Sequence, residues 1–415
     1  MKSLWLGGLI CASLLAAGTT DSETNINTRY TVEDVQVSTG SWTARVPSQN
    51  LQKLSSGLRQ DILSLIGEKF NPVALDNLAH RLRRELHART VDHRILRGRT
   101  PEYVQVVFDV RLNPTRFDVS VPKFLYQGEQ GWSGAVEGTA TVKQQGFTLG
   151  LVSDGDVLIE RYTGVEGRYE DAHLGTDRLR FDLEVGSYHE KWNNATLAVA
   201  PADQIYRARQ NVEPMLTFIP SHQLSFSVGT SFEQMQEIEP PAHSLAANSV
   251  AAGARYQRGF EGSDFLQDLE GDYSLRAAMR SLGSDFAYTR QRWRMRYSFT
   301  HGKHTVADEL TGGILLGNAP LFERFVLGDS GSLRGWNKYD INPIGGNRMV
   351  NNSVEYRYGA LELFYDTGAV WNSGASAIAR NSLGAGLREG LFSLAVAFPV
   401  REGRMDPVFM LGMNY

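Results

Sequence analysis

Cysteine and long apolar runs are what this 415-residue chain has least of. Its only cysteine, Cys11, lies in an apolar stretch near the N-terminus. A fold stapled by disulfides is therefore excluded, and so is a metal site built from several thiolates. After residue 17 no stretch comes near the ~20 apolar residues that a membrane-spanning helix needs. A mean hydropathy of −0.29 still allows a transmembrane β-barrel, because apolar and polar residues alternate along its strands.

The chain also lacks an excess of basic residues. It carries 42 Lys and Arg against 46 Asp and Glu, which gives a formal net charge of −4. Proteins that bind nucleic acid normally carry a basic footprint. Nucleic acid is therefore not an expected partner.

The first 17 residues have the layout of a cleavable secretory signal. Met1 and Lys2 give a positive start, an apolar run extends from Leu4 to Ala17, and small residues lie at its end. The run is too short to span a bilayer as a helix. Residues 1–17 are therefore predicted to be a signal peptide, and the exported remainder contains no cysteine.

Residues 30–112 combine strand-like and helix-like patterns. Apolar residues recur at helical spacing over 54–66, and a second helix is predicted after Asn71-Pro72, a favourable cap followed by a favourable first residue. Strand patterns precede these helices and return at 91–96 and 104–112. The predicted order is strand, helix, helix, strand, strand, which describes a small α+β domain.

From residue 113 to 415, apolar and polar residues alternate in many segments. In 178–186 four apolar residues occupy one phase and four charged residues the other, and 292–299 behaves similarly. Successive side chains of a strand point to opposite faces, so each segment has one apolar and one polar face. Many segments reach the ~9–11 residues of a membrane-crossing strand, whereas soluble strands average about five or six. Residues 113–415 are therefore predicted to form a transmembrane barrel of about 16 antiparallel strands, with about fourteen as the alternative.

One long glycine-rich connection, residues 318–347, divides the predicted barrel. About eleven strands precede it and about five follow it. Loops of this length are usually functional. The connection contains Phe322-Glu323-Arg324-Phe325, then Leu327-Gly328-Asp329, then Leu333-Arg334-Gly335-Trp336.

These motifs resemble those of a known superfamily of outer-membrane proteins. It is the POTRA-plus-barrel superfamily of BamA, TamA and the two-partner-secretion transporters, also called the bacterial surface antigen family. In that family a Val/Leu-Arg-Gly-aromatic tip folds into the barrel lumen. Two strand motifs match it as well: Phe364, Asp366 and Gly368 in one segment, and Gly384, Gly386, Leu387 and Arg388 in another. The resemblance is specific over about residues 320–415 and architectural before them.

The resemblance extends to residues 30–112, whose element order is similar to that of a single POTRA domain. Such a domain lies in the periplasm and captures unfolded polypeptides by adding a strand to its sheet edge. A rigid spacer at the barrel mouth is the alternative reading. The resemblance implies an outer-membrane barrel that inserts or translocates polypeptides without a cofactor. Its implied partners are unfolded polypeptide clients, outer-membrane lipids and other subunits of an envelope assembly.

The segment 360–370 predicts a partner for the arginine of the loop tip. Its alternation puts Glu362, Phe364 and Asp366 on the lumen side. An arginine inside a barrel needs a carboxylate, and the planar guanidinium pairs well with one. We therefore expect an ion pair between Arg334 and Asp366, with Glu362 as the alternative partner. Gly335 would allow a tight turn, and Trp336 would pack against the barrel wall.

The end of the chain alternates up to its last residue. Phe409, Leu411, Met413 and Tyr415 share one phase. This pattern resembles the signal by which barrel proteins are delivered to the membrane assembly machinery. It also fits an ordinary closing strand, and both readings can hold together.

An enzymatic function is not expected. Gly328-Asp329-Ser330-Gly331 resembles the nucleophile loop of trypsin-like proteases, but no histidine has the setting of that family. The sequence contains no dinucleotide, Walker or zinc-protease motif. Two other functions remain as alternatives: a passive solute channel, and an accessory subunit of a larger assembly.

Overall fold

We describe the fold from a computed structural model of the chain. It describes residues 29–40, 42–46, 54, 56–86, 88–112, 115–142, 145–176, 178–221, 223–238, 243–261, 265–401 and 405–413. The predicted signal peptide lies outside these residues. The chain divides into two compact units, residues 1–113 and residues 114–415.

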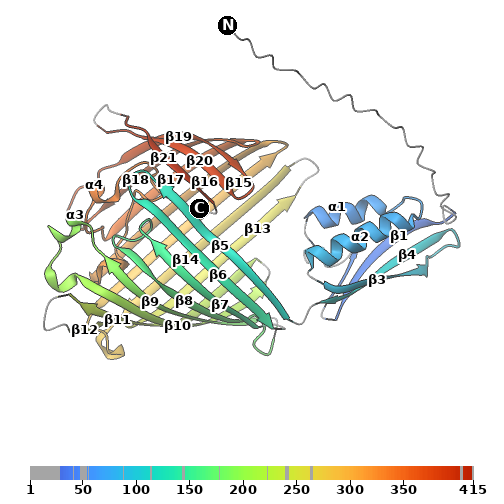
Figure 1. Ribbon diagram of the computed structural model, residues 1–415, viewed down its shortest axis with the longest axis horizontal. Helices are drawn as coiled ribbons and strands as arrows, with labels where there is room; N and C mark the ends of the chain where they lie inside the picture. The colour runs from blue at the N-terminus through green and yellow to red at the C-terminus, as the bar shows by residue number, and fades with distance from the viewer. Residues whose placement is uncertain are drawn as a thin grey trace, which may run out of the picture. The chain divides into compact units, whose positions relative to one another are not determined.

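The N-terminal unit is a small α+β domain (Figure 1). Its elements are β1 (Thr31–Thr39), β2 (Thr43–Val46), α1 (Ser56–Leu65), α2 (Pro72–Glu85), β3 (Ala88–Arg97) and β4 (Tyr103–Leu112). The sheet order is β2-β1-β4-β3, with β1 and β4 parallel and the other neighbours antiparallel. The predicted order omitted β2, because a strand of four residues is too short to show an alternation.

The two helices pack their apolar faces against this sheet. Asn71 caps α2 by accepting a hydrogen bond from the backbone N–H of Val73 at 3.1 Å. The buried residues of α2 are spaced three and four apart, and they share a core with the strands. In the described residues no helix is both long and apolar enough to cross a membrane.

The second unit is a closed antiparallel barrel (Figure 1). Its strands are β5 (Thr115–Gln127), β6 (Gly131–Val142), β7 (Gln145–Asp154), β8 (Arg161–Asp171), β9 (Leu179–Lys191), β10 (Tyr206–Ser221), β11 (Leu224–Glu237), β12 (Ser244–Ala246), β13 (Ser249–Glu261), β14 (Phe265–Ala278), β15 (Ala287–His301), β16 (His304–Asn318), β17 (Arg348–Tyr358), β18 (Leu361–Trp371), β19 (Arg380–Glu389), β20 (Phe392–Pro399) and β21 (Val408–Met413). Since β12 has only 3 residues, sixteen long strands form the wall. The predicted barrel and its strand number are confirmed.

The outward and inward faces of the wall follow the predicted alternation. On β18, Leu361, Leu363 and Tyr365 are exposed on the outside of the barrel. The alternate residues Glu362, Phe364 and Asp366 are buried toward the lumen. An apolar exterior of this kind fits a wall that faces lipid.

The two ends of the barrel differ in the length of their connections. At one end, here called the turn end, strands are joined by two-residue turns at 302–303, 359–360 and 390–391. The chain also enters β5 at this end. At the other end, the loop end, the longest connection joins β16 to β17 over residues 319–347. It includes the helical turns η4 (Leu321–Glu323) and α4 (Lys338–Ile341), and we call it the inward loop.

The barrel closes through a short seam between its first and last strands. Residues 410–413 of β21 pair with residues 124–127 of β5, which gives four register pairs. Neighbouring strands β15 and β16 are paired at 15 positions. Within the described part of the chain, the seam is the shortest junction between long neighbouring strands.

Candidate functional site

The inward loop fills the loop end of the lumen with apolar side chains. Its residues Leu321, Leu327 and Leu333 are almost completely buried. They belong to one core cluster with side chains of the barrel wall and of other connections. The wall and connection members of this cluster include Ile159, Trp192, Ile205, Tyr206, Met235, Phe286, Tyr288, Leu315, Met349 and Val370. The barrel is therefore packed at this end.

Arg334 at the tip of the loop contacts Asp366 of β18, the partner expected from the sequence. Its Nε and Nη2 atoms donate to the two carboxylate oxygens at 2.8 and 2.7 Å. Its backbone N–H donates to the same carboxylate at 3.1 Å. Arg334 is 5% exposed and Asp366 is completely buried. This is a bidentate, charge-assisted pair, which is the strongest form of arginine–carboxylate contact.

Further groups surround the same guanidinium. Arg334 donates to Glu355 at 2.9 Å, to the hydroxyl of Ser353 at 2.9 Å and to Glu362 at 3.5 Å. The Phe364 ring lies 3.7 Å from the guanidinium carbon, in a cation–π arrangement. Burial disfavours the charged form, but the hydrogen bond and charge of Asp366 outweigh it and raise the pKa of Arg334.

Arg388 of β19 adds a second arginine to this cluster. Its Nε lies 3.1 Å from Glu362. The cluster then contains three carboxylates and two arginines, so the loss of either arginine leaves buried negative charge without a partner.

Glycines of the family motifs lie where a side chain would collide with neighbouring groups. A Cβ at Gly384 would overlap the Phe364 ring. At Gly368 it would lie 3.0 Å from Leu327 of the loop. At Gly386 it would lie 2.9 Å from the Cβ of Ala395. Gly368 therefore makes room for the loop and Gly384 for the ring under Arg334, whereas Gly386 allows the close approach of β20.

The loop tip itself depends on Gly335 and Trp336. Gly335 has a φ of 84°, a conformation that favours glycine. Trp336 is buried, and its indole N–H donates to the carbonyl of Asn381 on β19 at 2.9 Å. The guanidinium groups of Arg380 and Arg401 lie 4.7 and 5.0 Å from the Trp336 ring.

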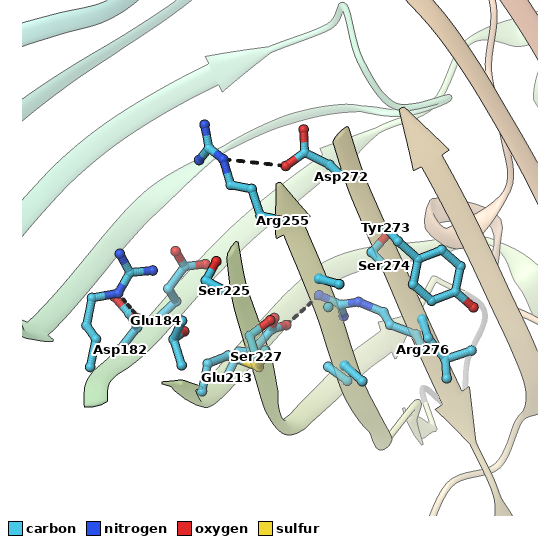
Figure 2. Close-up of a pocket in the computed structure, with 18 of the residues that line it drawn as sticks. Asp182, Glu184, Glu213, Ser225, Ser227, Arg255, Asp272, Tyr273, Ser274 and Arg276 are labelled. Atoms are coloured by element: carbon cyan, nitrogen blue, oxygen red, sulfur yellow. Dashed lines mark hydrogen bonds and ion pairs between the residues drawn. The ribbon is translucent and has the colours of Figure 1, made fainter. Parts of the chain in front are cut away.

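The lumen toward the turn end is a polar cavity of about 720 Å³ (Figure 2). Arginines and carboxylates from different strands form ion pairs along its wall. Arg276 lies 2.5 Å from Glu213, and Arg255 lies 3.7 Å from Asp272. Because the charges are of both signs and largely paired, the cavity has no strong preference for either sign. Among the described residues no cluster of three or more His, Cys, Asp and Glu side chains could hold a metal ion.

In the final strand, β21, the alternate side chains predicted to share one face point to the outside of the barrel. Phe409 is 57% and Leu411 is 46% exposed, and Met413 is partly exposed. Tyr415 lies outside the described residues. The side chains of Phe409, Leu411 and Met413 therefore lie on the outer surface of the barrel wall.

Sequence reasoning missed several partners of the loop. Ser353 and Glu355 lie in the lumen phase of β17, so the alternation of 348–358 could have identified them. Lys338 is also buried and contacts the connection between β7 and β8. No local signal predicts that contact, since the two segments are about 180 residues apart.

Comparisons with known proteins agree with this geometry. Residues 269–409 match the family model described as the Omp85 superfamily domain. A curated relative, the outer membrane protein assembly factor BamA of Nitratidesulfovibrio vulgaris, is 33% identical over 128 residues. That match covers 24% of this chain and only 16% of the relative.

Solved structures share the fold. The crystal structure of BamA from Haemophilus ducreyi lacking POTRA domains 1–3 aligns with a TM-score of 0.56 and 18% identity. The alignment covers 93% of this chain and 84% of that one. CdiB from Acinetobacter baumannii aligns with a TM-score of 0.53 and 15% identity, covering 93% and 74% of the two chains. Residues 269–409 therefore carry an Omp85 superfamily domain, and the chain is an outer-membrane β-barrel whose N-terminal unit lies in the periplasm.

Proposed function

We propose that the barrel inserts polypeptides into the outer membrane or translocates them across it. In this proposal the periplasmic unit captures an unfolded client and passes it to the seam between β5 and β21. The observation that carries the proposal is the short seam, with its four register pairs.

Among the junctions between long strands in the described residues, the seam has the fewest register pairs and so costs least to open. Four antiparallel pairs correspond to about four backbone hydrogen bonds. In lipid, unpaired backbone groups cost several kcal/mol each, so an open seam is unfavourable unless another strand pairs with it. An extended client can supply that strand. The seam therefore favours exchange of one strand for another over simple opening.

The edge of the periplasmic sheet supports client capture. Strand β3 pairs with β4 on one side, and no described strand pairs with its other side. Ile95 and Leu96 on this edge strand are 48% and 45% exposed. An unpaired edge with exposed apolar side chains suits a client that adds a strand with little sequence specificity.

The packed loop end argues against a passive solute channel. Apolar residues of the inward loop occupy the lumen there, and Arg334 ties the loop to the wall. A channel for polar solutes needs a continuous aqueous path. The polar cavity at the turn end supplies only part of one.

Site-specific photocrosslinking tests the proposal. A photoreactive residue is placed at Leu96 on the sheet edge or at Tyr126 on the seam, and Val165 on the distant β8 wall serves as the control. We expect polypeptides to crosslink at the first two positions and not at Val165. Barrel precursors among the products would indicate insertion, and a long secreted polypeptide would indicate translocation. A purified barrel that conducts ions and crosslinks no polypeptide at either position would contradict the proposal.

A further inference from the structure

The connection between β7 and β8 turns into the barrel. It comprises residues 155–160, and within it Asp156, Ile159 and Glu160 are at most 2% exposed. Ile159 belongs to the same apolar cluster as the inward loop. Burying a short polar connection is costly unless its backbone groups find partners. The inward loop supplies those partners.

Lys338 of the inward loop binds the backbone of this connection. Its ammonium group donates to the carbonyl oxygens of Gly155 at 2.5 Å, of Asp156 at 3.2 Å and of Leu158. An ammonium group has three N–H donors, so three carbonyls satisfy it completely. The Lys338 side chain is 1% exposed. It is thus a buried cation held mainly by backbone, and its loss leaves three carbonyls without a donor.

Two neighbours of Lys338 strengthen the contact. Ser330 donates from its hydroxyl and its backbone N–H to the carboxylate of Asp156, at 2.5 and 2.9 Å. The hydroxyl of Tyr339 donates to the carbonyl of Ile159 at 2.9 Å. Together with Lys338, they contact residues along most of the connection.

The same region of the loop reaches the first strand of the barrel. Gln130, in the turn after β5, donates from its side chain to the carbonyl of Gly328 at 2.5 Å. Asn337 donates to Glu129 in that turn at 3.1 Å. Lys123 of β5 bridges to Asp156 at 3.1 Å. The loop is therefore tied to β5 both directly and through the β7–β8 connection.

The inward loop thus contacts the wall on both sides of the seam. Arg334 is bound to β17 and β18, and Trp336 is bound to β19, which precede the last strand. Lys338 and Ser330 are bound to the β7–β8 connection, which follows the first strand. We propose that Lys338 and residues 155–160 form a second anchor of the loop, and that the two anchors together hold the β5–β21 seam closed.

The anchor matters for closure of the barrel because the seam is short. Its four pairs provide less cohesion than any other junction between long strands in the described residues. The loop adds contacts to both flanks and so resists their separation. Lys338 is a positioning residue in this account: it touches no client and acts through the placement of β5. The proposal deepens the proposed function, because it names what restrains the seam that a client would use.

Electron paramagnetic resonance distance measurements can test the anchor directly. Val136 on β6 and Leu394 on β20 flank the seam, and both are exposed on the outer wall. Because the only natural cysteine lies in the predicted signal peptide, Val136→Cys and Leu394→Cys can be spin-labelled specifically. In this labelled background Lys338→Met removes the ammonium group with little change in size. Lys303→Met, in an exposed turn at the other end of the barrel, is the matched control.

We expect Lys338→Met to add a population at longer distance. The shift should be at least about one strand spacing, ~5 Å, with the long-distance fraction raised several-fold over the parent and over Lys303→Met. Ser330→Ala and Tyr339→Phe remove single contacts and should give smaller shifts in the same direction. Folding of each variant is checked by its faster migration in unheated detergent gels.

A folded Lys338→Met barrel with the parent's distance distribution would overturn the anchor. If Lys338→Met does not fold, the two milder variants decide, and unchanged distances in both would overturn it equally. The measurement needs no client, so a negative result leaves the photocrosslinking test of function untouched. Conversely, Lys338→Met could still lengthen the distance across the seam in a barrel that handles no polypeptide clients.

Discussion

Replacement of Arg334 by methionine tests the buried charge cluster most sharply. The variant keeps the length of the side chain and removes its contacts with Asp366, Glu355, Glu362 and Ser353. Arg388 then remains paired with Glu362, and Asp366 and Glu355 lose their ion pair with Arg334. Breaking a buried ion pair by removing one partner costs about 3–5 kcal/mol. For a domain of this size that corresponds to a fall in apparent melting temperature on the order of 10 °C.

The assay is the temperature at which the folded band disappears in detergent gels. Arg255→Met is the matched control, because Arg255 also lines the lumen but its side chain is 58% exposed and pairs with Asp272 at 3.7 Å. An exposed pair of this kind is worth about 0–1 kcal/mol, so the control should shift by only a few degrees. Arg334→Lys should also be strongly destabilised, since lysine cannot donate in the bidentate geometry. Equal, small shifts for Arg334→Met and Arg255→Met would refute the reasoning.

Three further substitutions test other parts of the structure. Gly335→Ala puts a methyl group 2.8 Å from the Cβ of Ala397 and gives alanine a positive φ, so the folded band should be lost at a lower temperature. Gly390→Ala is the control, because Gly390 is exposed and also has a positive φ, so its substitution measures the cost of the backbone conformation alone. Gly384→Val should displace the Phe364 ring beneath the arginine, and a parent-like melting temperature would argue against that packing. Asn71→Ala should destabilise α2 by about 1 kcal/mol, seen as faster amide exchange confined to that helix in the full-length protein.

The alternation of side chains was sufficient to predict the barrel. Successive side chains of a strand point to opposite faces, so the alternation within a segment such as 178–186 predicts its lumen side and its lipid side without reference to the neighbouring strands. The strand β2 was missed because its four residues carry too little pattern. The sheet of the N-terminal unit therefore has one more strand than the sequence indicated.

The candidate site was only partly predictable, for a related reason. The sequence could predict Asp366 as a partner because the alternation along β18 places its side chain on the lumen face. The acceptors of Lys338 are backbone carbonyls of residues 155–160, and backbone groups leave no trace in a sequence. Their position depends on how two distant connections fold into one lumen. Contacts of this kind become visible only in three dimensions.

Controlled closure of the seam offers the most direct test of the central claim. Tyr126 and Leu411 are register partners across β5 and β21, so Tyr126→Cys and Leu411→Cys can form a disulfide. The variant is placed in liposomes with an unfolded barrel precursor or an unfolded secreted polypeptide, and insertion or protease protection of the client is measured. We expect client insertion or transport when the disulfide is reduced, and we expect this activity to be lost when the disulfide forms. Equal client handling in both states, or ion conduction without any client handling, would contradict the account.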